Sequence, residues 1–234
     1  MSTTINHNHN GDPLAVLEAK QKDIWRIFKI MSEFVDGFDL LSRTAPAVSI
    51  FGSARMKPGS KYYELTRRVA FDLASTGYAI VSGGGGGLME AANRGAKEAG
   101  GQSIGLNIAL PFEQKSNDYI DPDKIMTFQH FFVRKVMFVK YAQGFVVMPG
   151  GYGTIDEFSE AITLIQTKKT MEFPVILMGK SYWKKLLEWM KETAIAEGCI
   201  SEEDLDIFHV CDEPEEVVQI IKDFGIRHGY VTNF

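Results

Sequence analysis

Cysteine is scarce in this chain of 234 residues: Cys199 and Cys211 lie in different predicted elements and form no CxxC pair. This usage indicates a reducing, cytoplasmic setting. Long apolar runs are missing too, and none approaches the roughly 18 residues that a membrane helix needs, so no membrane partner is expected. The polar segment 1–12 lacks the apolar core of a signal peptide and is predicted to be a disordered tail. His7 and His9 belong to that tail, and no metal site is expected there.

An excess of positive charge is also missing. The chain carries 25 Lys and Arg against 30 Asp and Glu, which gives a net charge of −5 and a pI of about 5.6. This balance excludes a general basic field, so we expect no polymeric nucleic acid partner, although local basic spots stay open.

Two common nucleotide-binding motifs are absent. Wherever G-x-G-x-x-G is started in the run 83–87, its sixth position holds Leu88, Met89 or Glu90. The segment 103–107, about 20 residues further on, offers no acid for a ribose hydroxyl. The motif G-x-x-x-x-G-K-[ST] does not occur either. A dinucleotide-dependent dehydrogenase and a P-loop ATPase are therefore both disfavoured.

Short apolar runs alternate with amphipathic stretches from residue 47 onward. Parallel strands need crossover connections, so this alternation predicts an α/β fold: a Rossmann-like, doubly wound parallel sheet of about seven strands with helices on both faces. We expect residues 47–225 to form a single nucleotide-binding domain, because 45% apolar content can fill a substantial core. A long helix over 13–42 is expected to pack on that core or on a partner subunit.

The expected elements follow from the apolar periodicity and the glycine stops. The expected strands are 48–51, 78–81, 103–107, 125–128, 145–148, 175–178 and 207–210. The expected helices are 62–76, 87–99, 131–142, 154–167, 182–197 and 214–224.

Three glycine-containing loops follow predicted strands at the carboxyl edge of this sheet. They are Gly52-Ser-Ala-Arg55, the run 82–87, and Met148-Pro-Gly-Gly-Tyr-Gly-Thr-Ile-Asp-Glu157. A glycine-rich turn before a helix N-terminus exposes backbone N–H groups at the positive end of the helix dipole, which favours phosphate. We therefore expect one phosphate-bearing ligand at this rim. Arg55 is expected to contact either phosphate or a neighbouring chain.

The acid at the end of the third loop has two interpretations. Thr154 and Glu157 have the spacing of a capping box, in which Glu157 would serve its own helix. A carboxylate beside a phosphate cradle also suits chemistry on the bound molecule. Glu90, near the second loop, is interpreted as a surface acid that complements the helix dipole, and His130 as a packing residue.

The residues from Pro149 to Glu157 resemble the P-G-G-x-G-T-x-x-E signature of the Lonely Guy family. Residues 82–89 resemble that family's upstream glycine loop, and Arg134-Lys135 lies where the family carries an Arg-Lys pair. The resemblance runs from about residue 48 to 224. Adjacent helical positions point about 100° apart, so at most one of Arg134 and Lys135 is expected to face a pocket squarely.

The resemblance implies hydrolysis of the N-glycosidic bond of a nucleoside 5′-monophosphate, with adenine or an N6-modified adenine as base, to free base and ribose 5-phosphate. It implies Arg134 and Glu157 as the catalytic pair, no metal or organic cofactor, and a homodimer or higher homo-oligomer with the site near the interface. Phosphate or nucleotide contacts are expected from Ser53, Arg55, Gly84, Gly85, Gly86, Lys135, Gly150, Gly151, Gly153 and Thr154.

Other functions stay open at this point. The stretch 131–138 departs from the Met-containing pattern of compact family members, so the identity of the base is open, with AMP or another nucleotide as alternatives. A non-catalytic nucleotide- or cofactor-binding protein, like the molybdenum-cofactor carriers that resemble this family, needs the glycine loops but not Arg134 with Glu157. Lysine decarboxylation is the weakest alternative, because no pyridoxal-phosphate site can be identified.

Overall fold

The structure is a computed structural model that describes residues 13–111, 115–230 and 233. The tail predicted over residues 1–12 lies outside the described residues. Within the described part, no helix combines the length and the apolar character that crossing a membrane requires. The same residues contain no group of three or more His, Cys, Asp or Glu side chains placed to hold a metal ion.

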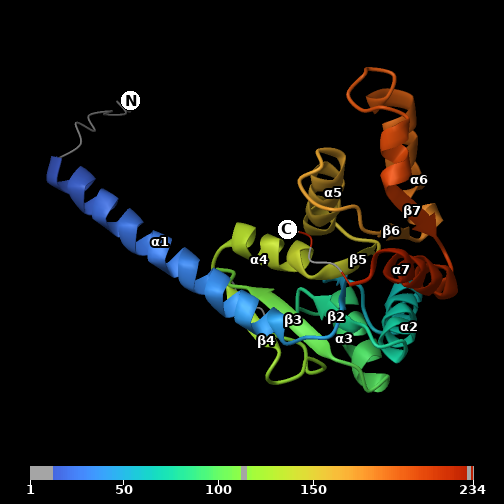
Figure 1. Ribbon diagram of the computed structural model, residues 1–234, viewed down its shortest axis with the longest axis horizontal. Helices are drawn as coiled ribbons and strands as arrows, with labels where there is room; N and C mark the ends of the chain where they lie inside the picture. Colours follow the sequence, from blue (N-terminus) through green and yellow to red (C-terminus); the bar gives the residue numbers. More distant parts are fainter. Residues whose placement is uncertain (1–12, 112–114, 231–232, 234) are drawn as a thin grey trace, which may run out of the picture.

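Seven parallel strands form one sheet in the order β4-β3-β2-β1-β5-β6-β7 (Figure 1). This confirms the predicted doubly wound α/β fold. The strands are β1 Ala47–Phe51, β2 Ala79–Ser82, β3 Ser103–Ile108, β4 Ile125–Phe128, β5 Ala142–Val147, β6 Val175–Met178 and β7 Phe208–Cys211.

Helices cover both faces of the sheet, and two separate apolar clusters mark the two layers (Figure 1). One layer holds α2 Lys61–Ser75, α3 Leu88–Glu98 and α7 Pro214–His228. The other holds the end of α1 Pro13–Ser42 together with α4 Phe131–Lys140, α5 Tyr152–Gln166 and α6 Lys180–Trp189. On β1, Val48 and Ile50 face the first layer, while Ala47 and Phe51 face the second. A strand buried on both faces reads as a continuous apolar run, which is why the inner strands were visible in the sequence.

The winding direction reverses at the centre of the sheet. From β1 the chain adds β2, β3 and β4 on one side, and it then returns to place β5 on the other side of β1. Residues 47–49 of β1 pair in parallel with β2, and residues 47–51 pair in parallel with β5. Such a switch point separates the loops that follow the two strands, and ligands of doubly wound sheets bind there.

Helix α1 is only partly attached to the rest of the molecule. Its C-terminal half packs on the core through Phe34, Phe38 and Leu41, and its N-terminal half extends away from the sheet (Figure 1). The carboxylate of Glu33 accepts hydrogen bonds from the backbone N–H groups of Gln129 and His130, at 3.0 and 3.3 Å. It also lies 3.1 Å from Nδ1 of His130. A carboxylate at the start of α4 satisfies unpaired N–H groups and complements the helix dipole.

Several element ends differ from the prediction. Helix α5 begins at Tyr152 rather than at 154, and β5 begins at Ala142 because this residue pairs with Ala47 of β1. Helix α6 ends at Trp189 and continues as a π-helical turn over Met190–Ala194. A 3₁₀ turn over Glu203–Ile207 then leads into β7. These ends depend on pairing and packing with distant segments, which local periodicity does not encode.

Candidate functional site

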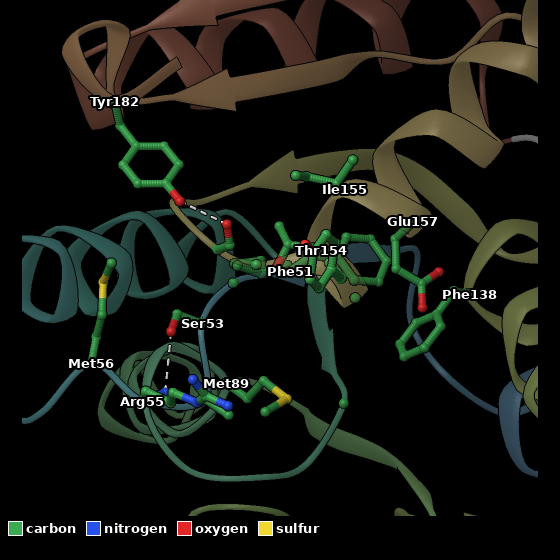
Figure 2. A pocket seen from close by; sticks show the side chains of 18 of the residues that line it. Phe51, Ser53, Arg55, Met56, Met89, Phe138, Thr154, Ile155, Glu157 and Tyr182 are labelled. Atoms are coloured by element: carbon green, nitrogen blue, oxygen red, sulfur yellow. Dashed lines mark hydrogen bonds between the residues drawn. The ribbon is translucent and has the colours of Figure 1, made fainter. Parts of the chain in front are cut away.

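A cavity of about 720 Å³ lies at the switch point, at the carboxyl ends of β1 and β5. Its polar wall comes from the loop after β1, from the turn and first helical residues after β5, and from α4. Figure 2 shows Glu157 and Phe138 at one end of the lining and Tyr182 at the other. The lining residues are Ile50, Phe51, Gly52, Ser53, Ala54, Arg55, Met56, Gly83, Met89, Arg134, Phe138, Gly150, Gly151, Tyr152, Gly153, Thr154, Ile155, Glu157 and Tyr182.

The turn after β5 presents backbone donors to this cavity. Gly151 is the N-cap of α5, and the first hydrogen bond of the helix runs from the Ile155 N–H to the Gly151 carbonyl at 3.0 Å. The N–H groups of the three intervening residues therefore have no partner within the helix. A Cβ built on Gly151 or on Gly153 would meet no heavy atom within 4 Å. The turn thus combines free N–H groups, the positive end of a helix dipole and open space, which together suit an anion.

The capping-box interpretation of Thr154 and Glu157 is wrong. With Gly151 as N-cap, Thr154 is the third residue of α5 and Glu157 the sixth, and the N-cap has no side-chain hydrogen bond. Thr154 instead packs inside the turn, where a Cβ on Gly150 would lie 2.0 Å from its hydroxyl oxygen. The Glu157 side chain therefore does not cap the N-terminus of its own helix.

Arg134 of α4 and Glu157 of α5 face each other in the cavity. Nη2 of Arg134 lies 3.6 Å from Oε1 of Glu157, and the two side chains are 13% and 6% exposed. This distance permits electrostatic attraction but exceeds a hydrogen bond. Nε of Arg134 and Oε2 of Glu157 are buried without a hydrogen-bond partner among the described residues. Buried polar atoms in this state are available to a ligand.

Aromatic rings surround the guanidinium group. Its carbon lies 5.3 Å from the ring centre of Phe131 and 5.5 Å from that of Phe138. Cation–π attraction of this kind stabilises a desolvated positive charge and restricts its position. The arginine is therefore held by its surroundings before any ligand binds.

Burial raises the pKa of Glu157 to about 7, although the nearby charge of Arg134 opposes the shift. Burial also lowers the pKa of Arg134 from its usual value, against the attraction of Glu157. Glu157 can therefore hold or release a proton near neutral pH, which suits a general acid or base. Arg134 remains a fixed positive charge.

Lys135 points elsewhere. Its Nζ lies 3.0 Å from Oδ1 of Asp156 and 3.5 Å from Oε2 of Glu160, so it joins α4 to the outer side of α5. This agrees with the expectation that at most one of the two adjacent basic residues faces the pocket. The structure does not bring Lys135 into the cavity lining, and its contact with a nucleotide stays a prediction.

The second glycine loop contributes less than its composition suggested. Gly83 lines the cavity, while Gly86 lines a separate hollow of about 330 Å³. The carbonyl groups of Gly84 and Gly85 accept hydrogen bonds from the backbone and the side chain of Asn117, at 2.9 and 3.0 Å. Gly84, Gly85 and Gly86 are thus not among the residues that line the main cavity, and their contact with a nucleotide stays a prediction.

The loop after β1 lies at the cavity, where it was expected. Ser53 and Arg55 line the cavity, and the Ser53 hydroxyl accepts the N–H of Arg55 at 3.2 Å (Figure 2). Tyr182 of α6 also reaches the cavity and donates its hydroxyl to the Gly150 carbonyl at 2.7 Å. No motif in the sequence marked Tyr182, which lies 32 residues beyond Gly150. Only the adjacency of β5 and β6 brings the two together.

The sequence has recognisable relatives. A family model described as "Possible lysine decarboxylase" matches residues 89–221. The cytokinin riboside 5′-monophosphate phosphoribohydrolase LOG1 of Arabidopsis thaliana is 28% identical over 176 residues, which are 74% of this chain and 80% of that protein. The enzyme of the same name from Rhodococcoides fascians is 26% identical over 184 residues, which are 76% of this chain and 90% of that protein.

Solved structures resemble the fold. A molybdenum cofactor binding protein from Rippkaea orientalis aligns with a TM-score of 0.56 at 20% identity, over 77% of this chain and 98% of that one. A structural-genomics protein designated TM1055 aligns with a TM-score of 0.56 at 26% identity, over 76% of this chain and 98% of that one. At such identities the first similarity concerns the fold alone.

Proposed function

The chain belongs to the Lonely Guy family, whose sequence model is described as a possible lysine decarboxylase, and we propose that it is a nucleoside 5′-monophosphate phosphoribohydrolase. It would cleave the N-glycosidic bond and release the free base and ribose 5-phosphate. The observation that carries this proposal is the buried pair of Arg134 and Glu157, which shares one cavity with the free N–H groups of the α5 N-terminus.

The turn at Gly150–Thr154 would hold the phosphate and thereby place the ribose. Phosphate binding that is equally strong in the ground state and in the transition state lowers KM and does not raise kcat. It accelerates bond cleavage only when it orients the ribose. Ser53 and Arg55 lie on the opposite loop and would add donors to the same group. This arrangement would direct C1′ of the ribose toward Glu157.

Cleavage of an N-riboside builds positive charge on the sugar and negative charge on the departing base. The Glu157 carboxylate would stabilise the sugar cation and accept a proton from the attacking water. The departing base would take up a proton from solvent, and Glu157 would return its own to solvent. Arg134 keeps its proton at neutral pH, so its role would be to stabilise the departing base electrostatically. One preorganised charge of this kind contributes roughly 3–4 kcal/mol to the barrier, a factor on the order of 10² to 10³ in rate.

Adenine or an N6-modified adenine is the base that we propose. Apolar side chains line the cavity beside the candidate catalytic pair, among them Met89, Phe138 and Ile155. A flat, largely apolar base would bury its faces against such a wall. Products of this reaction from an N6-modified nucleotide would be free cytokinins, as the names of the relatives indicate for those proteins.

A panel of substrates tests the proposal. The purified chain is incubated with 5′-monophosphates and with the matching nucleosides, and the release of free base is followed by chromatography. Release from AMP or its N6-modified form, with little release from the nucleosides, is expected. If every 5′-monophosphate binds but none is cleaved, the function is that of a non-catalytic carrier, and the proposal is wrong.

We also propose that the chain acts as a homodimer or a larger homo-oligomer, without a metal or organic cofactor. Two neighbouring helices, α1 and α4, expose large apolar side chains: Trp25, Ile27, Phe28, Met31, Val35, Phe131 and Phe132. Exposed apolar patches of this kind mark interaction surfaces. Light scattering after size exclusion is expected to give a multiple of 26.2 kDa, and a monomer at micromolar concentration would contradict this assignment.

A further inference from the structure

Hydrogen-bond donors from outside the turn after β5 bind two of its carbonyl oxygens. The Tyr182 hydroxyl donates to the Gly150 carbonyl at 2.7 Å, and the Ser53 N–H donates to the preceding carbonyl, that of Pro149, at 3.1 Å. Two successive carbonyl groups of the turn are therefore bound, one from the β6 side and one from the β1 side. Motion of the turn about these two peptides is restricted in consequence.

Neighbouring aromatic rings contact the Tyr182 side chain. Its ring packs edge-on against Trp183 at 4.9 Å and against Tyr62 at 6.3 Å between ring centres. Trp183 is buried, and its indole N–H donates to the Met178 carbonyl at 3.0 Å. The β6–α6 turn also lies against the turn after β5, since a Cβ on Gly179 would be 3.6 Å from Pro149. Tyr182 is 42% exposed, and its ring contacts together with the buried Trp183 beside it hold its hydroxyl at the turn.

The hydrogen bond to the Gly150 carbonyl also fixes the direction of the Gly151 N–H, because both groups belong to one peptide. In a planar trans peptide the C=O and the following N–H point to opposite sides. A hydrogen bond from Tyr182 to the Gly150 carbonyl therefore turns the N–H of Gly151 away from Tyr182. In the view of Figure 2, Tyr182 lies on one side of the turn, and Ser53 and Arg55 lie on the other. A bound carbonyl also strengthens the N–H of the same peptide as a donor, because hydrogen bonds in a chain polarise one another.

We propose that Tyr182 is a positioning residue for phosphate, acting through the Gly150–Gly151 peptide to aim the Gly151 N–H at the 5′-phosphate. The inference rests on the proposed function for the identity of the ligand. It adds a residue from a helix outside the signature sequence. Tyr182 makes no contact with the reacting atoms in this assignment, so its loss weakens phosphate recognition and leaves bond cleavage intact.

Tyr182→Phe tests this role, because it removes the hydroxyl and keeps the ring. The binding of inorganic phosphate and of ribose 5-phosphate is measured by calorimetry, and the Gly151 amide is followed by ¹⁵N NMR during the same titrations. Both affinities are expected to fall about 3- to 10-fold, the range that one neutral hydrogen bond supplies. The phosphate-induced shift of the Gly151 amide is expected to shrink. KM for a 5′-monophosphate rises by the same factor, while kcat stays within about twofold.

Tyr62→Phe is the matched control. Its hydroxyl lies 3.4 Å from that of Ser181 and its ring contacts Tyr182, but it is not among the residues that line the cavity. This variant is expected to bind phosphate like the parent protein. Unchanged phosphate affinity in Tyr182→Phe, or an equal loss in both variants, would overturn the proposal, as would a parent protein that binds neither probe. If phosphate binding responds as expected but no nucleotide is cleaved, the positioning role stands and the proposed function falls.

Discussion

The glycine loops after β2 and after β5 look alike in sequence, but the structure uses them in opposite ways. In the loop after β2, the glycines permit close packing. The Gly84 and Gly85 carbonyl groups are bound by Asn117, and a Cβ on Gly87 would lie 2.4 Å from the Ser53 carbonyl oxygen. Gly87 also has φ +66°, in the region that favours glycine.

In the loop after β5, the glycines leave room. Gly151 and Gly153 border the cavity with no neighbour within 4 Å of a built Cβ. The carbonyl groups of Pro149, Gly150 and Gly151 are bound by protein donors, whereas the N–H groups of residues 152–154 have no partner within the helix. A glycine-rich loop thus serves either the packing of the protein on itself or the approach of a ligand, and the loop's composition does not distinguish the two.

The acids that follow the two loops differ in the same way. Glu90 is the third residue of α3 and accepts the Tyr63 hydroxyl at 2.7 Å. Glu157 is the sixth residue of α5, is buried, and has an oxygen without a partner among the described residues. Glu90 is satisfied by its own layer of the protein, whereas Glu157 faces the cavity.

The largest expected difference between the two regions concerns turnover. Glu157→Gln is expected to lower kcat for a 5′-monophosphate by a factor on the order of 10² to 10³, because an amide can neither accept the proton of water nor stabilise the sugar cation. Glu90→Gln changes an acid of the same type after the other loop and is expected to keep kcat within about threefold. Steady-state kinetics on both variants decides this. Equal losses would remove Glu157 from the catalytic role.

The next effect concerns stability in the loop after β2. Gly87→Ala is expected to lower the free energy of unfolding by about 3 kcal/mol, since a methyl group would collide with the Ser53 carbonyl and the backbone conformation disfavours alanine. Gly100 has a similar φ of +70° but open space around a built Cβ, so Gly100→Ala should cost only about 1 kcal/mol. Urea denaturation measures both, and equal losses would show that the close contact is unimportant.

The pH dependence of stability sharpens the assignment of Glu157. Its pKa is about 7 in the folded protein against an ordinary value of 4.5, so the folded state binds this proton more tightly than the unfolded state. The resulting stabilisation is complete below pH 4.5 and is lost as the pH rises to about 7. Relative to Glu157→Gln, the parent protein is expected to lose about 2 kcal/mol over this interval. Parallel unfolding free energies for the two proteins across that range would contradict the burial of an unsatisfied carboxyl.

The smallest expected effect concerns binding at the open turn. In Gly151→Ala the methyl group enters empty space at φ −96°, so stability should change by less than about 0.5 kcal/mol. The same methyl group occupies the cavity, and the affinity for ribose 5-phosphate is expected to fall about tenfold. Calorimetry and thermal melting test the two halves separately. Loss of stability without loss of affinity would mean that this loop is a packing loop like the one after β2.

The fold and most of the cavity rim follow from the sequence. Inner strands such as β1 and β5 are buried on both faces, so they appear as short apolar runs that need no long-range information to recognise. Ser53, Arg55 and Gly151 follow such strands directly, and all parallel strands end at one edge of the sheet. The pairing of Arg134 with Glu157 came from the family resemblance, and the structure places them 3.6 Å apart.

The structural details that the sequence did not indicate depend on contacts between distant segments. Lys135 has the same local pattern as Arg134, but Asp156 and Glu160 on the neighbouring helix take its ammonium group. The second loop is rich in glycine, but Asn117 from a remote loop binds its carbonyl groups. Helix α5 begins two residues before the expected residue 154, and its N-cap is Gly151 rather than Thr154. The first two of these details depend on a partner residue that lies far away along the chain, and local sequence does not identify that partner.

Local chemistry alone therefore predicted the parallel sheet, an anion-binding turn at Pro149–Thr154 and a carboxylate beside that turn. Apolar periodicity and the backbone preferences of glycine act within a few residues, so they can be read along the chain. The tertiary structure decided that Glu157 is buried beside Arg134 and does not cap α5, and that the Tyr182 hydroxyl donates to the Gly150 carbonyl. It also decided that Lys135 pairs with Asp156 and Glu160 outside the cavity lining. Burial, desolvation and hydrogen-bond partners arise from packing between α4, α5 and α6, and these contacts exist only once the sheet has brought the helices together.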